Sequence, residues 1–410
     1  METQNRKKKI LILFSSYSER ENLEFIRSHA MGNPVLSSLV FSRKLLKGAL
    51  SNYDETFVFS SPPIGSYPNH SDILLFKGFD AVNNVITPPH LNVVLLRNPS
   101  IARGLIKSFE KCKKQGFFRN SIVDVVAVEA HTPFLKAAMH AKKTLPSSSL
   151  TLIVLDLPNA MNPFKHSFLY SIAKSVDNKK IVNMSKHVDG FVFLSKGMAD
   201  YFKPNERPFF VSEGIYDSFH SNENVFVKNR VVYTGLINET YSGIVSLLMA
   251  DTGLLGNPNV DFIIAGSGDN QKLFDLSKKY ENIKFLGSVS DDEAKQIQET
   301  ASVLVNPRPI SPSFAESFPS KLIDYVSTGN PVVTFKLKGI PPDYDDLLIY
   351  PKSSNYQSFI EKVKECLSFS QMERDFIKRK SKLMVENKNS VSFVMKIVEL
   401  ANKERQKQGR

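Results

Sequence analysis

Residues 316–333 read ESFPSKLIDYVSTGNPVV. Apolar residues recur at helical spacing through the middle of this stretch, and Pro319 stands where a first helical turn tolerates proline. Gly329 is a typical helix end and a proline follows it, so we expect a helix over 319–328 with Ser317 as its N-cap. The valines at the end predict a buried strand. The stretch is therefore a helix that returns the chain to a sheet.

The same alternation covers the rest of the chain. Nearly continuous apolar runs separated by helical stretches are typical of parallel sheets covered on both faces. In the first half we predict a helix over 168–187 and strands at 8–16, 54–61, 72–78, 92–98, 123–131, 150–158, 189–195 and 208–217. In the second half we predict helices at 244–255, 273–280 and 291–301 and strands at 230–235, 260–269, 282–289 and 302–309.

This pattern predicts two doubly wound α/β domains in tandem. The chain has 410 residues, more than one domain usually holds. A polar, asparagine-rich stretch separates the halves, so we expect domains at 1–220 and 221–385, and a basic helix over 386–410 that packs back on the first domain. Such domains bind ligands at the carboxyl ends of their strands, and two of them facing each other form a cleft.

The charge balance favours anionic partners. Lys and Arg number 53 against 41 Asp and Glu, a net charge of +12. A phosphorylated ligand, an anionic membrane surface or nucleic acid would fit, and so would a merely solvated basic surface. Nucleic acid lacks support, because the chain has no helix-turn-helix, zinc or RNA-binding signature.

The cysteines and the apolar runs indicate a cytoplasmic protein. Cys112 and Cys366 are the two cysteines, too far apart to suggest a zinc site or a redox pair, and so few suit a reducing compartment. The basic lead METQNRKKK is followed by too short an apolar run for a signal peptide. Since no run reaches the length of a membrane span, we expect any membrane contact to be peripheral.

Two basic residues converge on the start of the helix expected over 319–328. Lys321 falls in its first turn, where the positive end of the helix dipole makes a lysine unfavourable unless an anion binds nearby. A phosphate would satisfy both the lysine and the free N–H groups. Arg308 ends the preceding strand and would point to the same place. Together they predict a diphosphate clamp that needs no metal.

Two carboxylates accompany this clamp. Glu316 precedes the helix and Asp324 lies inside it. Carboxylates accept hydrogen bonds from hydroxyls, so the pair suits recognition of a sugar and a ribose. The competing interpretation is an acidic residue favoured by the helix dipole and a solvent-facing polar residue.

The stretch 316–333 resembles the donor-binding motif of the retaining glycosyltransferases of the large family four, which have the GT-B fold. That motif is an acidic residue, seven residues, a second acidic residue, then Gly-x-Pro and a buried strand; here aspartate replaces the usual second glutamate. LVNPRP followed by FPSKLIDY resembles a bacterial polysaccharide-assembly branch. YTGLINETYSG, IIAGSGD and IKFLGSVSDDE extend the resemblance over most of 230–335, and LDLPNAMNP, FVFLSKGMADYF and VSEGIYD extend it more weakly into the first half.

The resemblance implies roles in binding a nucleoside-diphosphate sugar. Glu316 would contact the donor sugar and Asp324 the ribose. The remaining implied or expected donor-binding positions are Gly235, Gly266, Gly268, Val289, Ser317, Phe318 and Ser320. For Gly266 and Gly268 the competing interpretation is an ordinary strand-end turn.

One departure from the family pattern matters. Many relatives carry an Arg and a Lys in the loop after the glycine at position 235, whereas here residues 236–242 read LINETYS and contain no base. Either Arg308 and Lys321 neutralise the leaving diphosphate instead, which we prefer, or the site is weakened. We therefore expect Glu316, Lys321 and Arg308 to be the catalytic residues.

The first half is expected to bind the acceptor. Candidates are Gly32 in the loop after the first strand, and Glu129 and His131 after another strand; a histidine capping the strand end is the alternative for His131. The stretch 106–119 mixes lysines with Phe109, Phe117 and Phe118. It could lie on an anionic membrane that carries a lipid-linked acceptor, although a charged solvent-exposed face explains it slightly better.

The resemblance thus implies a retaining, metal-independent glycosyltransferase of the hexosyltransferase type, without a cofactor. It would move a sugar from a nucleotide-sugar donor to a glycan or lipid-linked acceptor in cell-surface polysaccharide or exopolysaccharide biosynthesis. Two alternatives remain open: a sugar-nucleotide epimerase of the same fold, and a non-catalytic glycosyltransferase-like partner subunit.

Overall fold

The protein is seen in a computed structural model and divides into two compact units. Unit 1 comprises Met1–Ile215 with Ser390–Arg410, and unit 2 is Tyr216–Asn389. The chain thus passes between units a few residues from the boundaries expected at 220 and 385. The structure describes residues 7–31, 37–157, 168–221, 225–238, 242–268, 271–311 and 318–407.

Unit 1 is built on an eight-stranded sheet in the order β10-β9-β8-β7-β1-β2-β5-β4. All neighbouring strands are parallel except β4 and β5. The strands are β1 (Lys8–Ser15), β2 (Glu55–Ser60), β4 (Phe79–Val82), β5 (Val85–Thr87), β7 (Ser121–Val128), β8 (Ser149–Val154), β9 (Gly190–Phe193) and β10 (Phe209–Val211). A separate antiparallel ribbon joins β3 (Leu75–Phe76) to β6 (His90–Leu91).

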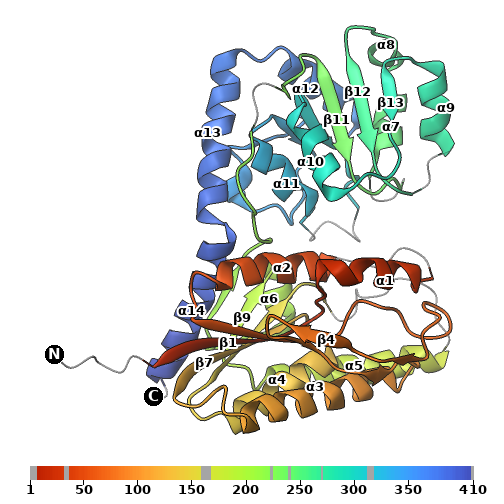
Figure 1. The fold of residues 1–410 in the computed structure, drawn as a ribbon. Helices are drawn as coiled ribbons and strands as arrows, with labels where there is room; N and C mark the ends of the chain where they lie inside the picture. The colour runs from red at the N-terminus through yellow and green to blue at the C-terminus, as the bar shows by residue number, and fades with distance from the viewer. Residues whose placement is uncertain are drawn as a thin grey trace. The chain divides into compact units, whose positions relative to one another are not determined.

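Helices cover both faces of this sheet (Figure 1). Side chains of β1 alternate between two cores: Ile12 and Phe14 pack on one face, Leu11 and Leu13 on the other. This double burial explains why the strand is a continuous apolar run. The first face receives α3 (Arg97–Lys114), α4 (Thr132–Thr144), α5 (Phe168–Ser185) and α6 (Lys196–Phe202), and the second receives α2 (Ser37–Ala49) and α14 (Ser390–Lys407). The short α1 (Leu23–Ser28) precedes them.

Unit 2 has a six-stranded, fully parallel sheet in the order β13-β12-β11-β14-β15-β16. Counted within the unit this is 3-2-1-4-5-6, the strand order of a doubly wound nucleotide-binding domain. Its strands are β11 (Arg230–Thr234), β12 (Asp261–Ala265), β13 (Ile283–Phe285), β14 (Val303–Asn306), β15 (Val332–Thr334) and β16 (Leu348–Ile349).

Two helical layers also cover the sheet of unit 2 (Figure 1). In β11, Val231 and Tyr233 face one core while Val232 faces the other. The first core includes α7 (Ile244–Met249), α8 (Thr252–Leu255), α9 (Gln271–Lys279) and α12 (Tyr356–Leu367), and the second includes α10 (Asp291–Glu299), α11 (Lys321–Thr328) and α13 (Gln371–Asn387). The prediction of two tandem doubly wound domains is therefore confirmed.

Some local predictions were wrong. The strand expected at 92–98 does not form: Leu95 takes a left-handed φ of 69°, and α3 already begins at Arg97. The helix expected over 244–255 is broken into α7 and α8, because the Asp251 carboxylate caps a new turn by accepting from the N–H groups of Gly253 and Leu254. The strands expected at 72–78 and 208–217 shrink to β3 and β10.

Candidate functional site

The strand order of unit 2 marks one place on its sheet. Chain order reverses between β11 and β14, and ligands of open α/β sheets bind beside such a point, at the carboxyl ends of the strands. Gly235 follows β11 there, and Arg308 follows β14 by two residues. We call this place the switch-point edge of unit 2. Two predicted site residues from distant parts of the sequence thus reach the same edge.

The loops after β11 and β12 are pressed together at this edge. The N–H of Gly235 donates to the Ala265 carbonyl at 2.9 Å, and that of Ile237 to the Ser267 carbonyl at 2.7 Å. Gly266 has φ +155°, and a Cβ there would lie 1.8 Å from the Gly235 oxygen; at Gly268 (φ +136°) it would lie 1.9 Å from the Ile237 oxygen. Both glycines are therefore required by the neighbouring loop itself.

Lys321 reaches from α11 to the end of β11. Its Nζ donates to Tyr233 Oη at 2.7 Å and lies 4.0 Å from the centroid of that ring. A Cβ on Gly235 would come within 2.8 Å of the same Nζ, so glycine makes room for the amine. Burial, and then the charge of Arg308, lowers the pKa of Lys321 from 10.5 to about 7. A titratable amine thus lies beside Gly235, at the start of the loop 236–242 that contains no base.

The two residues that hold this arrangement were missed at the sequence level. Tyr233 donates to the Leu236 carbonyl at 2.7 Å while it accepts from Lys321. Tyr325 is fully buried; its Oη accepts from the Thr234 N–H at 2.9 Å and donates to the Thr234 carbonyl at 3.1 Å. By spacing, Tyr233 is an ordinary core position of a strand and Tyr325 an ordinary core position of a helix. The one sequence feature that could have pointed to Tyr325 as a site residue is its place one helical turn after Lys321.

The start of α11 differs from the prediction. The helix begins at Lys321 with Ser320 as its N-cap, two residues later than expected, and Ser320 makes no capping bond through its side chain. The reason is that Leu322 and Ile323 donate to the carbonyls of Pro319 and Ser320 in a tighter turn. The expected end is confirmed: Gly329 is the C-cap, with φ 74°.

The other predicted donor residues fall into two groups. Phe318 packs its ring 5.2 Å from that of Tyr344, Asp324 is half-buried on α11, and Val289 lies half-buried in the loop between β13 and α10. Their expected ligand contacts stay predictions. Glu316 and Ser317 lie outside the described residues.

Unit 1 has a switch point of its own, between β1 and β7. Glu129 and His131, both predicted on the acceptor side, follow β7 directly, whereas Gly32 lies outside the described residues. Glu129 has a left-handed φ of 74°, a strained conformation for a non-glycine residue. His131 stands at the N-cap of α4 without a side-chain capping bond, so its imidazole does not serve the helix end.

The environment of Glu129 and His131 shifts the pKa of each side chain in the direction that favours its uncharged form. Burial raises the pKa of Glu129 to about 7, against a hydrogen bond from Ser38 that lowers it. Burial, and then the charge of Arg97, lowers the pKa of His131 to about 3. At neutral pH the edge therefore holds a neutral imidazole and a partly protonated carboxyl group, which are features of functional sites.

This perturbation gives a testable pH dependence. With a pKa raised from 4.5 to about 7, the folded protein binds a proton that the unfolded chain has released, so stability falls as pH rises through this window. Glu129→Gln should remove the loss. We expect the variant to exceed wild type at pH 8 by on the order of 2–3 kcal/mol and to match it near pH 4.5.

Urea unfolding of both proteins between pH 4.5 and 8 measures this difference. The exposed Glu399→Gln on α14 serves as the control and should behave like wild type. A Glu129→Gln protein with the same pH dependence as wild type would show that Glu129 is ionised normally.

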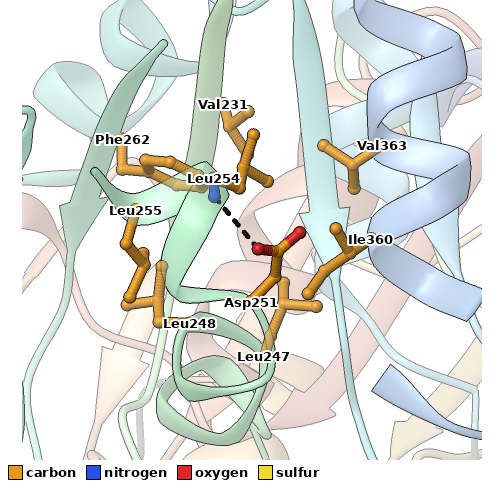
Figure 2. Close-up of a pocket in the computed structure, with 9 residues that line it drawn as sticks. All are labelled: Val231, Leu247, Leu248, Asp251, Leu254, Leu255, Phe262, Ile360 and Val363. Atoms are coloured by element: carbon orange, nitrogen blue, oxygen red, sulfur yellow. Dashed lines mark hydrogen bonds between the residues drawn. The ribbon is translucent and has the colours of Figure 1, made fainter. Parts of the chain in front are cut away.

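The pocket in Figure 2 lies elsewhere on unit 2. Val231 and Phe262, near the beginnings of β11 and β12, line it, so it is at the sheet edge opposite the switch point. Asp251 is its one polar lining residue, and the carboxylate already accepts from Leu254 at 3.1 Å and pairs with Lys364 at 2.6 Å. This apolar pocket is a gap between α7, α8 and α12, unsuited to a nucleotide.

The described residues contain neither a metal-binding cluster nor a membrane-spanning helix. In the described ranges, no three His, Cys, Asp or Glu side chains gather so that they could hold a metal ion. Cys112 and Cys366 are buried and free. No helix among the described residues is long and apolar enough to cross a bilayer. In the basic stretch 106–119, Phe109 and Phe118 lie in the core of unit 1 and only Phe117 is exposed, so the stretch cannot insert its phenylalanines together into lipid.

Sequence comparison places a known domain over unit 2. Residues 228–368 match the family model described as glycosyl transferases group 1. The matched range contains Gly235, Arg308 and Lys321, and it is a domain of transferase enzymes. No curated protein matches the chain in sequence.

Solved structures resemble the whole fold. A variant of S. aureus TarM in complex with fondaparinux, alpha-GlcNAc-glycerol and UDP has a TM-score of 0.53 at 13% identity, over 77% of this chain and 61% of that one. Sucrose-phosphate synthase from Thermosynechococcus elongatus gives 0.56 at 11%, over 97% and 99%. An alpha,alpha-trehalose-phosphate synthase (UDP-forming) from Burkholderia vietnamiensis gives 0.59 at 9%, over 97% and 100%.

At these identities the likeness shows the fold alone. It is the GT-B fold, two Rossmann-like α/β domains with parallel sheets. The chain spans 61% and 65% of the two TarM chains, less than two thirds of their length.

Proposed function

We propose that the chain is a retaining, metal-independent glycosyltransferase. It moves a sugar from a nucleoside-diphosphate donor, bound by unit 2, to a glycan or lipid-linked acceptor, bound by unit 1, in the assembly of a cell-surface polysaccharide. The observation that carries the proposal is the contact of Lys321 with Tyr233 and Gly235, a cation at the switch-point edge of a domain matched by the group 1 glycosyl transferases.

The clamp acts on the leaving group. When the bond between the sugar and the β-phosphate breaks, negative charge grows on the diphosphate oxygens, and Lys321, Arg308 and the N–H groups at the start of α11 stabilise it. Lys321 has a pKa of about 7 in the free protein. A bound diphosphate favours its ammonium form, so the lysine takes up a proton as the donor binds.

The acceptor hydroxyl then attacks the sugar carbon. A new carbon–oxygen bond forms on the face that the diphosphate leaves, and the hydroxyl proton passes to a diphosphate oxygen. Retention and the contact of Glu316 with the donor sugar rest on the resemblance of 316–333 to the family motif. Three cationic or N–H groups at one edge can balance the diphosphate charge, which supports a reaction without a metal ion.

The same geometry bears on the alternative of an inactive partner subunit. That alternative arose because residues 236–242 contain no base. Lys321 Nζ lies against Gly235, at the beginning of that very loop, and so supplies the charge from another element. This supports an active enzyme.

We place it in the cytoplasm at the inner face of the membrane, held by the lysines of α3 and not by inserted phenylalanines.

Thermal unfolding against a panel of nucleoside diphosphates and their sugars, without metal, tests the donor site. One nucleotide family should stabilise the protein, by about 2.7 kcal/mol at 100 times its dissociation constant. Lys284→Met, an exposed lysine on β13, is the control and should respond like wild type. Nucleotide release that requires an acceptor marks a transferase. If no nucleotide stabilises the protein, the proposal fails.

A further inference from the structure

Arg97, the half-buried first residue of α3, carries a guanidinium charge that no described group pairs with. Burial lowers the pKa of its guanidinium, and its Nε is buried without a hydrogen-bond partner. Glu129 acts on the guanidinium only through its charge; no ion pair or hydrogen bond joins the Arg97 side chain to a described group. A buried charge without a partner is costly. The unpaired guanidinium of Arg97 therefore indicates that a ligand supplies the counter-charge.

Three serine hydroxyls that follow or end β1 and β2 also lack a hydrogen-bond partner. Ser15 ends β1, Ser61 follows β2, and the N–H of Ser61 donates to the Ser15 carbonyl at 3.3 Å, so the two lie side by side. Ser18 comes three residues after Ser15. The Oγ atoms of all three are buried and have no hydrogen-bond partner. Since buried polar groups are nearly always paired, these hydroxyls await an acceptor.

The arginine and the serines belong to one edge of the sheet. β1 lies between β2 and β7, with Ser15 opposite Ser60 and Phe14 opposite Ala127. Ser15 is thus level with the end of β7, just before Glu129 and His131. Arg97 lowers the pKa of both of these residues, which places it beside them. The unpartnered donors accordingly surround the switch point of unit 1, where a ligand is expected.

We propose that this edge is an oxyanion subsite that binds a phosphate or diphosphate group of the acceptor. That the phosphate belongs to the acceptor rests on the proposed function. The subsite itself rests on the unpartnered groups of Arg97, Ser15, Ser18 and Ser61. A guanidinium binds phosphate through two parallel N–H bonds. The oxygens of a phosphate point to the corners of a tetrahedron, so those that the guanidinium does not bind suit hydroxyl donors on neighbouring loops better than a planar carboxylate does.

The carboxyl groups nearby do not prevent this. Burial raises the pKa of Glu129 to about 7 and that of Asp156 above its ordinary value. A bound anion raises both further, so Glu129 becomes a protonated O–H donor to the ligand. His131 is neutral and opposes neither charge.

Inorganic phosphate and pyrophosphate, titrated calorimetrically into the full chain, test the subsite. The titration is done in a Lys321→Met background, so that the switch-point edge of unit 2 binds the probe more weakly. Adding Arg97→Met should weaken binding at least tenfold, and Arg97→Lys, which keeps the charge but loses the fork, should weaken it less. Arg103→Met, exposed on the same helix, is the matched control and should bind as before.

Stability separates a binding role from a structural one. Because the half-buried Arg97 guanidinium has no described partner, Arg97→Met without phosphate should unfold at the same or a higher urea concentration than its parent. Undiminished phosphate binding by Arg97→Met overturns the proposal. A variant that is strongly destabilised without phosphate also overturns it, since Arg97 would then support the fold. If Arg97→Met does not fold, phosphate binding and urea unfolding of Arg97→Lys decide instead.

Assays of sugar transfer then distinguish two possible sources of the phosphate. A soluble sugar phosphate and a lipid-diphosphate-linked sugar in detergent are each offered with the donor. Arg97→Met should raise the acceptor KM for the one that is used and leave donor binding unchanged. If neither is used although donor binding is intact, the subsite assignment fails while the donor half of the proposed function stands.

Discussion

Lys321→Met is expected to lower kcat/KM by roughly 10²- to 10³-fold, the loss seen when one preorganised group is removed from a developing negative charge. The protein should stay folded, because methionine fills a similar volume and removes a half-buried amine whose pKa burial has lowered to about 7. Steady-state kinetics and nucleotide binding, measured together, give both effects. Relative to wild type, the variant should lose more affinity for the nucleoside diphosphate than for the corresponding nucleoside monophosphate.

Two further variants isolate the cause. Tyr233→Phe keeps the ring under Lys321 but removes the hydroxyl that accepts from Nζ at 2.7 Å, so its loss of activity should be smaller than that of Lys321→Met. Lys284→Met removes an exposed lysine and should change nothing. Full activity of Lys321→Met would show that the diphosphate is neutralised by other groups and that the contact with Gly235 is structural.

Gly266→Ala is expected to destabilise unit 2 by more than about 4 kcal/mol, at the extreme of single substitutions. A methyl group there would lie 1.8 Å from the carbonyl oxygen of Gly235, and φ is +155°. The two loops would have to separate, and the hydrogen bond from the Gly266 N–H to the Gly287 carbonyl, 2.7 Å, would be disturbed with them. Denaturant unfolding measures the loss.

Gly287→Ala is the matched control. Gly287 also has a left-handed φ, +69°, but a Cβ there meets nothing within 4 Å. It should therefore cost only the backbone strain, about 1–2 kcal/mol. If both variants lose the same stability, the loops after β11 and β12 can part without penalty, and their close approach does not hold the edge together.

The fold class could be predicted because both sheets are buried on two faces. A strand such as β1 must then be apolar at every position, as Ile12 and Leu13 illustrate from opposite cores. The same rule misled at 92–98, where an equally apolar run forms no strand. Leu95 and Leu96 are 69% and 54% exposed, and they turn the chain into α3. Nothing in the local pattern distinguishes an exposed leucine from a buried one.

The candidate site was predictable where a residue conflicted with its local surroundings. Lys321 is unfavourable at the positive end of a helix, and that conflict revealed it before any geometry was known. Tyr233 shows no such conflict, since an aromatic residue in a strand is ordinary. Arg97 was hidden for a different reason: it was assigned to the end of a strand, so its burial and its lack of a partner could only be seen in the folded chain.

The return of α14 to unit 1 has a consequence for synthesis. Unit 1 is encoded in two separated stretches, and α14 covers the same sheet face as α2. A ribosome must therefore complete all of unit 2 before the last helix of unit 1 exists. Until then Leu11, Leu13 and their neighbours remain partly uncovered on the nascent chain, a surface for chaperones to shield. A chain that ends at Asn389 would hold a whole unit 2 attached to a unit 1 that cannot close its core.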